Sequence, residues 1–131
     1  MDTHQRIAQR VLAEHSAIAE RLRLNAAAVL DYALRNVDRW SREFTPDHRP
    51  GWLVEWGRLL TGPMDALIAA LTDDTDAGAQ LRETSPFVGL LTFQERLEIL
   101  HRVDPEMARA LEVFASSWDE RFPPAEELAG R

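Results

Sequence analysis

The 131-residue chain contains no cysteine, no lysine and only one tyrosine. Without cysteine, disulfides and thiolate metal sites are excluded, and a reducing compartment suits the chain. No run approaches the roughly 20 apolar residues that a membrane span needs, so we expect no membrane association. The length is typical of one domain that buries its own core. We therefore expect a cytoplasmic, single-domain protein.

Because lysine is absent, all 15 basic residues are arginines, and 22 acidic residues bring the formal net charge to −7. The charge is uneven, since residues 1–50 carry a net +1 and residues 51–131 a net −8. Attraction to nucleic-acid phosphates needs a positive face, which only the N-terminal part could supply. The acidic chain is therefore a poor general binder of nucleic acid.

Apolar residues recur at helical spacing along most of the chain, and no stretch alternates like a half-buried strand. From Thr3 to Arg42 one apolar stripe continues without a glycine or a proline. A single long helix fits this stripe, and so do two helices that meet near Asn25. The pattern predicts an all-α fold with a long N-terminal helical region.

Prolines, glycines and capping residues delimit shorter helices in the rest of the chain. We expect these helices over residues 51–60, 64–71, 77–83 and 92–102, with a last one from residue 105. Pro123 and Pro124 should end the last helix. The prediction is a helical bundle of about five to six helices in a single domain, residues 1–122, with a flexible tail at residues 123–131.

No arrangement typical of a catalytic or metal site stands out in the sequence. The four histidines lie in four separate segments, and no two have the i, i+4 spacing of paired ligands on a helix. We interpret each as a surface or edge histidine. The serines lack a G-x-S-x-G context, and no glycine-rich phosphate loop is present. We predict that the protein is not an enzyme and binds no metal or cofactor.

Residues 18–37 have the spacing of a helix-turn-helix, and Asn25 is placed to cap the second helix. However, Arg23 stands at the turn position where a glycine is usual. The second helix would present alanines and Asp31 where base reading mainly needs Arg, Asn or Gln. A DNA-binding transcriptional regulator is therefore an alternative hypothesis.

The N-terminal stripe is flanked by arginines, and a long helix cannot bury two faces inside so small a domain. Part of it would then be covered by another chain, although an internal bundle helix fits the pattern equally well. Tryptophan and arginine are common interface anchors, and the chain has four tryptophans. The candidate partner-binding residues are Arg21, Leu22, Arg35, Arg39, Trp40, Trp52 and Trp56.

Three segments carry a resemblance: RNVDRW (35–40), GPMDALIAAL (62–71) and LRETSPFVGLLTFQERLEIL (81–100). Together they resemble small all-helical antitoxin-like proteins of high-GC bacteria that carry an SPFxGLLTxxERxxxL block. The chain departs from that pattern at Phe93, where a proline would suit the first helical position. The resemblance covers about residues 15–103 and implies neutralisation of a cognate toxin by direct contact, without catalysis.

Our leading hypothesis is therefore a protein-interaction module, an antitoxin-like inhibitor that binds and neutralises a partner protein. The arginines would pair with acidic groups or a phosphate-handling pocket of that partner, and the apolar stripe would supply desolvated area. The alternatives are a helix-turn-helix regulator and a structural homodimer. An α-helical homodimer would associate with its own copy rather than with a different protein.

Overall fold

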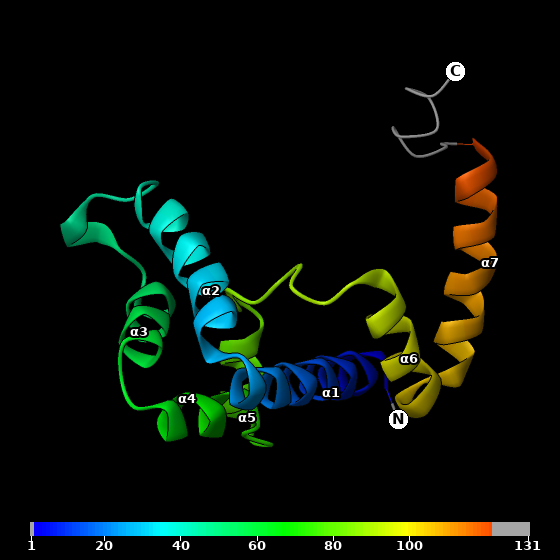
Figure 1. Cartoon of the computed structure of the whole chain (residues 1–131), viewed down its shortest axis with the longest axis horizontal. Helices are drawn as coiled ribbons and strands as arrows, with labels where there is room; N and C mark the ends of the chain where they lie inside the picture. Colours follow the sequence, from blue (N-terminus) through cyan, green and yellow to red (C-terminus); the bar gives the residue numbers. More distant parts are fainter. Residues whose placement is uncertain (1, 122–131) are drawn as a thin grey trace. The chain divides into compact units, whose positions relative to one another are not determined.

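The computed structural model describes residues 2–121, with the side chains of residues 2–116, and no strand occurs within that range (Figure 1). This confirms the all-α prediction, with seven α-helices where five to six were expected. None of the described helices is both long and apolar enough to cross a membrane. The helices are α1 (Thr3–Leu24), α2 (Ala26–Ser41), α3 (Gly51–Leu60), α4 (Met64–Leu71), α5 (Asp76–Arg82), α6 (Phe93–Val103) and α7 (Pro105–Arg121), with a short 3-10 helix, η1 (Pro46–His48).

The chain divides into two compact units, residues 1–92 (unit 1) and residues 93–131 (unit 2). Each unit is described by itself below. The single domain over residues 1–122 stays a prediction. The tail predicted at residues 123–131 lies outside the described residues.

The N-terminal stripe forms two helices that meet at Asn25. The backbone leaves helical geometry there, at φ −149° and ψ 70°, while the Asn25 N–H still donates to the carbonyl of Arg21 (2.8 Å). The Asn25 side chain makes no capping hydrogen bond to α2. The break turns α2 steeply away from α1 (Figure 1). Both helices thereby direct an apolar face into the same core, which a straight 39-residue helix could not do.

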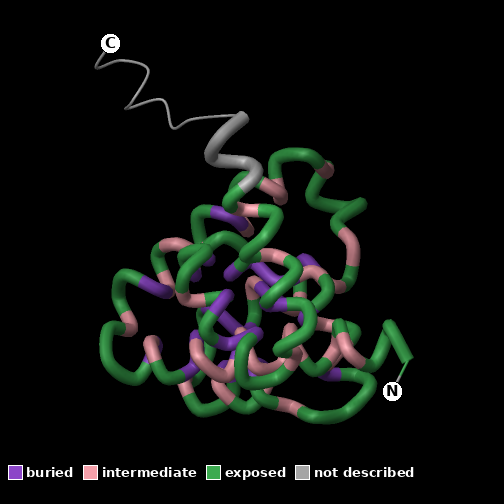
Figure 2. The backbone as a smooth tube through the Cα atoms, turned by 90° about the vertical axis from the view of Figure 1, so that its right-hand side faces the viewer, coloured by how far each residue is buried: buried purple, intermediate pink, exposed green. Residues whose placement is uncertain are grey.

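The core of unit 1 lies among its five α-helices, of which α1 contacts α2, α4 and α5, and α3 contacts α2 and α4. Figure 2 shows the buried residues gathered inside the bundle. Trp56 of α3 is 0 % exposed and packs edge-to-face on Phe87, with ring centroids 6.2 Å apart. The other fully or nearly buried apolar residues of unit 1 are Ile18, Ala19, Leu22, Val29, Ala33, Leu53, Leu59, Leu60, Leu67, Leu71, Pro86 and Leu91.

Local sequence signals set the helix starts in unit 1. The helices predicted over residues 51–60 and 64–71 begin and end at those residues. The Thr75 hydroxyl accepts a hydrogen bond from the Gly78 N–H, so α5 begins at Asp76, one residue before the predicted start. A threonine N-cap therefore sets the start of α5.

Unit 2 is a helical hairpin of α6 and α7. Its small core contains Leu97, Leu100 and Ala108, with Leu111 packed against them. The Asp104 carboxylate accepts from the Met107 N–H (3.3 Å), and Pro105 opens α7, which confirms the predicted start of the last helix.

Candidate functional site

The segment Arg82–Val88 runs from the end of α5 through the SPFV turn and is held by side chains from several helices of unit 1. The Trp56 indole N–H donates to the Thr84 hydroxyl (3.0 Å), which itself donates to the Leu81 carbonyl (2.9 Å). This contact fixes the segment against α3. The buried indole thus has its polar atom satisfied, as a core tryptophan requires.

Helix α2 holds the other end of the same segment. The Asn36 amide donates to the Pro86 carbonyl (2.7 Å), and the Tyr32 hydroxyl donates to the Val88 carbonyl (2.5 Å). The next residue, Gly89, adopts φ +86°, a left-handed conformation that favours glycine. The SPFV turn is therefore fixed by α2 on one side and by a glycine bend at its exit.

A histidine–serine contact joins the turn to α1. The buried His15 ring donates from Nδ1 to the Val11 carbonyl (2.7 Å), and the Ser85 hydroxyl donates to Nε2 (2.7 Å). The Ser85 oxygen also accepts the Phe87 N–H (3.1 Å). Desolvation lowers the pKa of His15 from 6.5 to about 4. The hydrogen bond to the Val11 carbonyl opposes part of this lowering, and the charge of Arg82 adds a smaller lowering of the pKa. His15 is therefore neutral at pH 7.

This contact places a base beside a hydroxyl, the first requirement for an activated serine nucleophile. Ser85 is only 1 % exposed, however, and its hydroxyl is committed to two hydrogen bonds. The other His15 nitrogen meets a backbone carbonyl instead of an orienting carboxylate. We interpret the pair as a structural link between α1 and the turn.

The buried Arg82 side chain is a second internal anchor. Its guanidinium donates to the Asp73 carbonyl (2.7 Å) and, at 3.4 Å each, to the carbonyls of Ala70 and Leu71. It therefore ties the end of α5 to the end of α4. Its Nε has no hydrogen-bond partner.

On its outer side the segment borders a groove of about 380 Å³, which we call the tryptophan groove. Trp40, from the end of α2, and Trp52, from the start of α3, meet edge-to-face with ring centroids 6.1 Å apart. A hollow of about 460 Å³ shares Trp52, Glu83 and Thr84 with the groove. The groove is lined by Trp40, Glu43, Phe44, Trp52, Glu83, Thr84, Ser85 and Val88.

The structure separates the predicted partner-binding residues into three groups. Trp40 and Trp52 are half-buried and lie together in the groove. Leu22 and Trp56 are core residues, 1 % and 0 % exposed, so no partner can reach them in the folded protein. They have the same helical spacing as Trp40 and Trp52, which is why spacing alone did not distinguish buried from half-buried candidates.

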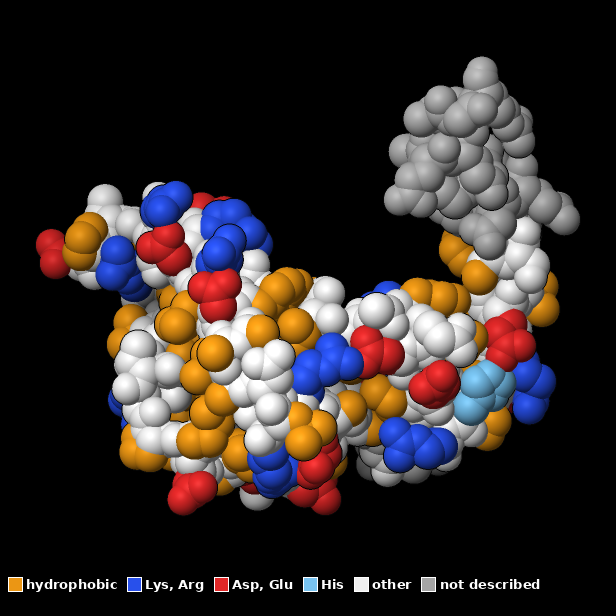
Figure 3. Space-filling model, viewed as in Figure 1, with side chains coloured by type: hydrophobic (Ala, Val, Ile, Leu, Met, Phe, Trp, Pro, Cys, Tyr) orange, Lys and Arg blue, Asp and Glu red, His pale blue; other side chains and the backbone are white. Residues whose placement is uncertain are grey.

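The three predicted arginines lie on α1 and α2. Arg21 is half-buried, whereas Arg35 and Arg39 are exposed. Arg35 forms an ion pair with Asp31 one turn away (2.8 Å), and Arg39 donates to the Asn36 side-chain oxygen (2.6 Å). On the face seen in Figure 3, positive and negative side chains are intermixed over the upper end of α2.

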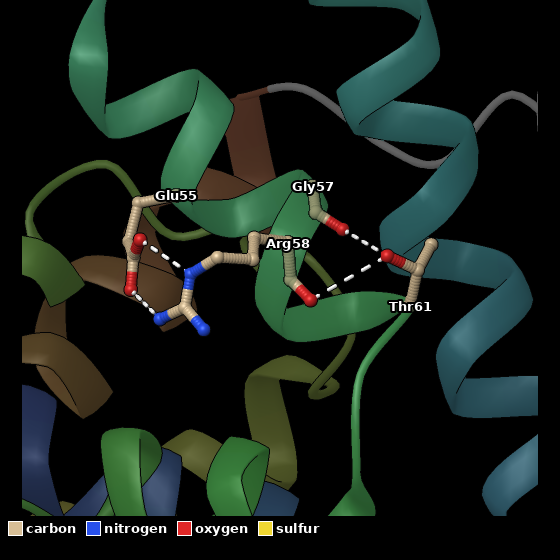
Figure 4. Close-up of polar contacts among 4 residues, drawn as sticks. All are labelled: Glu55, Gly57, Arg58 and Thr61. Carbon is tan, nitrogen blue, oxygen red and sulfur yellow. Dashed lines mark hydrogen bonds and ion pairs between the residues drawn. The ribbon is translucent and has the colours of Figure 1, made fainter.

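Arg58, which the sequence places beside the tryptophans of α3, is also engaged. Its guanidinium makes a two-pronged contact with Glu55, which raises the pKa of Arg58 and lowers that of Glu55 (Figure 4). At the end of α3 the Thr61 hydroxyl donates to the Gly57 carbonyl (2.8 Å). This end of α3 is therefore satisfied internally, and the groove lies at the Trp52 end.

Sequence reasoning missed four residues that shape the site. His15 was expected at the surface or at an edge and is buried, and Asn36 was not singled out. Glu43 and Glu83 were not singled out, because exposed acids are common in this chain. Asn36 carried one usable signal, a polar residue on the buried face of an amphipathic helix.

Among the described residues, no group of three or more His, Cys, Asp or Glu side chains is arranged to hold a metal ion. Comparison of the chain with protein-family models, curated proteins and solved structures finds no match.

Proposed function

We propose that this chain is a protein-interaction module and that unit 1 binds a partner protein through the tryptophan groove. The observation that carries the proposal is the placement of Trp40 and Trp52, which come from different helices and line a groove instead of the core. Tryptophan is enriched among the residues that dominate binding energy, because a large rigid ring buries much area at low entropic cost.

The rigidity of the groove floor supports the same function. Thr84 and Ser85 line the groove and are fixed from behind by Trp56 and His15. A site whose shape is set before binding loses less entropy when the partner docks. The groove is therefore built on a segment that side chains of α1, α2 and α3 hold in place.

An antitoxin-like role, in which the bound partner is a toxin, is the specific form of this proposal. It is supported by the resemblance of the 35–40, 62–71 and 81–100 segments to antitoxin-like proteins. Arg35 and Arg39 would lie at the margin of the contact, because they precede Trp40 on α2.

The helix-turn-helix alternative receives less support from the geometry. One residue, Asn25, connects α1 and α2, whereas a helix-turn-helix uses a turn of three to four. On α2, Asp31 and Asp38 neutralise Arg35 and Arg42 through i, i+4 ion pairs. This helix therefore offers little net positive charge to a phosphate-lined groove.

Affinity capture from the native cell tests the proposal, using the wild-type chain, the double variant Trp40→Ala/Trp52→Ala and the control Val54→Ala. Val54 is 57 % exposed on α3 but does not line the groove. We expect one protein to be retained by the wild type and by the control and lost with the double variant. A toxin role further requires that this protein arrests growth alone and not when co-expressed with the chain.

Equal retention by all three chains would overturn the groove as the binding site. A dimer in light scattering with no retained protein would instead favour the structural homodimer.

A further inference from the structure

The tryptophan groove combines aromatic faces with negative charge. Its rings are those of Trp40, Phe44 and Trp52, and its charged lining residues are Glu43 and Glu83, with no arginine or histidine among the lining residues. Both glutamates are exposed. The carboxylates of the groove are therefore complementary to a cation, and its aromatic rings are complementary to the aliphatic part of a side chain.

The two carboxylates also differ from the acids on the neighbouring helices. Asp31, Asp38 and Glu55 each form an ion pair with an arginine three or four residues further along the chain. Within the part of the chain that the structure describes, no arginine forms such a pair with Glu43 or Glu83. The negative charge of the groove is therefore available to a ligand.

We infer that the tryptophan groove takes an arginine side chain from a segment of the partner protein, with its guanidinium stacked on one ring of the edge-to-face Trp40–Trp52 pair and paired with the groove carboxylates. This inference rests on the proposed function and names the group that the groove recognises. A guanidinium is planar and weakly hydrated, so it stacks on aromatic rings and donates two parallel hydrogen bonds to a carboxylate. Lysine lacks the planar group and should bind less tightly.

The volume of the groove fits this occupant. At about 380 Å³ it lies in the roughly 300–1,000 Å³ range of small-ligand sites, which accommodates one long side chain and its flanking backbone. The adjoining hollow beside Trp52 and Glu83 provides room for the chain to continue.

The test measures binding of dye-labelled peptides to the full chain by fluorescence anisotropy. One peptide carries a single arginine between glycine and serine residues, a second carries citrulline, which keeps the shape without the charge, and a third carries lysine. We expect the arginine peptide to bind about ten-fold more tightly than the citrulline peptide, with the preference reduced by added salt.

Glu43→Gln/Glu83→Gln should reduce this preference at least several-fold, and the control Glu98→Gln on α6 should leave it unchanged. Circular dichroism checks that each variant is folded, which is expected because these side chains are exposed. Equal binding of the arginine and citrulline peptides, or an unchanged preference in Glu43→Gln/Glu83→Gln, would overturn the inference.

These outcomes are separable from those of the capture experiment. If the partner is lost with Trp40→Ala/Trp52→Ala while the peptides show no preference for arginine, the groove binds a partner by another group and only this inference fails. If the arginine peptide binds as expected and no partner is captured, the groove recognises a guanidinium, but the proposed function fails and with it the assignment of that guanidinium to a partner protein.

Discussion

The two sides of the Arg82–Val88 segment differ in almost every physical respect. On the inner side, Trp56, His15 and Asn36 hold the segment through directed hydrogen bonds. On the outer side, Trp40 and Trp52 face a groove with two exposed glutamates. Trp52 and Trp56 are one helical turn apart on α3, yet they lie on opposite sides of this segment. The inner contacts contribute to the stability of the fold, and we propose that the outer side binds a partner.

The largest expected effect comes from removing the inner tryptophan. Trp56→Ala should lower the free energy of unfolding by about 3–5 kcal/mol, because it leaves a cavity and an unpaired Thr84 contact. Trp52→Ala should lower it by only about 1 kcal/mol, the scale of a lost aromatic pair. Urea unfolding followed by circular dichroism at 222 nm measures both. Equal losses of unfolding free energy in the two variants would show that the inner and outer tryptophans do not differ in their contribution to stability.

The second largest effect is expected from acidification, which should lower the free energy of unfolding through His15 on the inner side. In the folded state the pKa of His15 is about 4, below its ordinary value of 6.5, so the unfolded chain binds this proton first. Stability is therefore fully present above pH 6.5 and falls as the pH drops toward 4. The loss from this residue is about 3 kcal/mol in total.

The pH effect is measured as the difference in unfolding free energy between the wild type and His15→Gln across pH 4–7. Acidic side chains outside the turn titrate in both proteins and cancel in the difference. A difference that does not change with pH would show that His15 is not held neutral by its burial.

Substitutions of two glycines should change the stability by smaller amounts, and the two changes should have opposite signs. Gly89→Ala should cost about 1–2 kcal/mol, because φ is +86° and the new Cβ would lie 2.7 Å from the Tyr32 hydroxyl. Gly57→Ala, in the interior of α3, meets nothing within 4 Å and should stabilise by roughly 0.5–1 kcal/mol. Thermal unfolding of the two variants tests this prediction. A stabilised Gly89→Ala variant would contradict the claim that the turn ends in a left-handed conformation that requires glycine.

The smallest effect on stability is expected for the arginines of α2. Arg35→Glu/Arg39→Glu should change the unfolding free energy by less than about 1 kcal/mol, because both side chains are exposed and the Arg35–Asp31 pair is a surface one. If these arginines contact the partner, the same variant should lose partner capture. If the variant captures the partner as well as the wild type does, these arginines are not part of the interface.

The sequence predicted most helices because their starts depend on neighbouring residues. The proline before α4, the Thr75 cap of α5 and the Asp104–Pro105 start of α7 are all short-range signals. The break at Asn25 was left open, since it contains neither glycine nor proline and is set by how α1 and α2 share a core.

The candidate site was predictable only in part. Trp40 and Trp52 were chosen for their residue type, and the structure brings them together. The His15–Ser85 contact joins residues 70 positions apart, so no local pattern could indicate it. The burial of Leu22 and Trp56 depends on which neighbour packs over each face of an amphipathic helix, and periodicity alone does not determine that neighbour.

The most direct test of the central claim, that the tryptophan groove is the binding surface, is a nuclear magnetic resonance titration of the ¹⁵N-labelled chain with the captured partner. Indole N–H signals of individual tryptophans are assigned by substitution. We expect the Trp40 and Trp52 signals to shift or broaden, while the signal of the Trp56 indole N–H, which is hydrogen-bonded to Thr84 in the core, stays in place. Perturbation of Trp56 with Trp40 and Trp52 unchanged would contradict it.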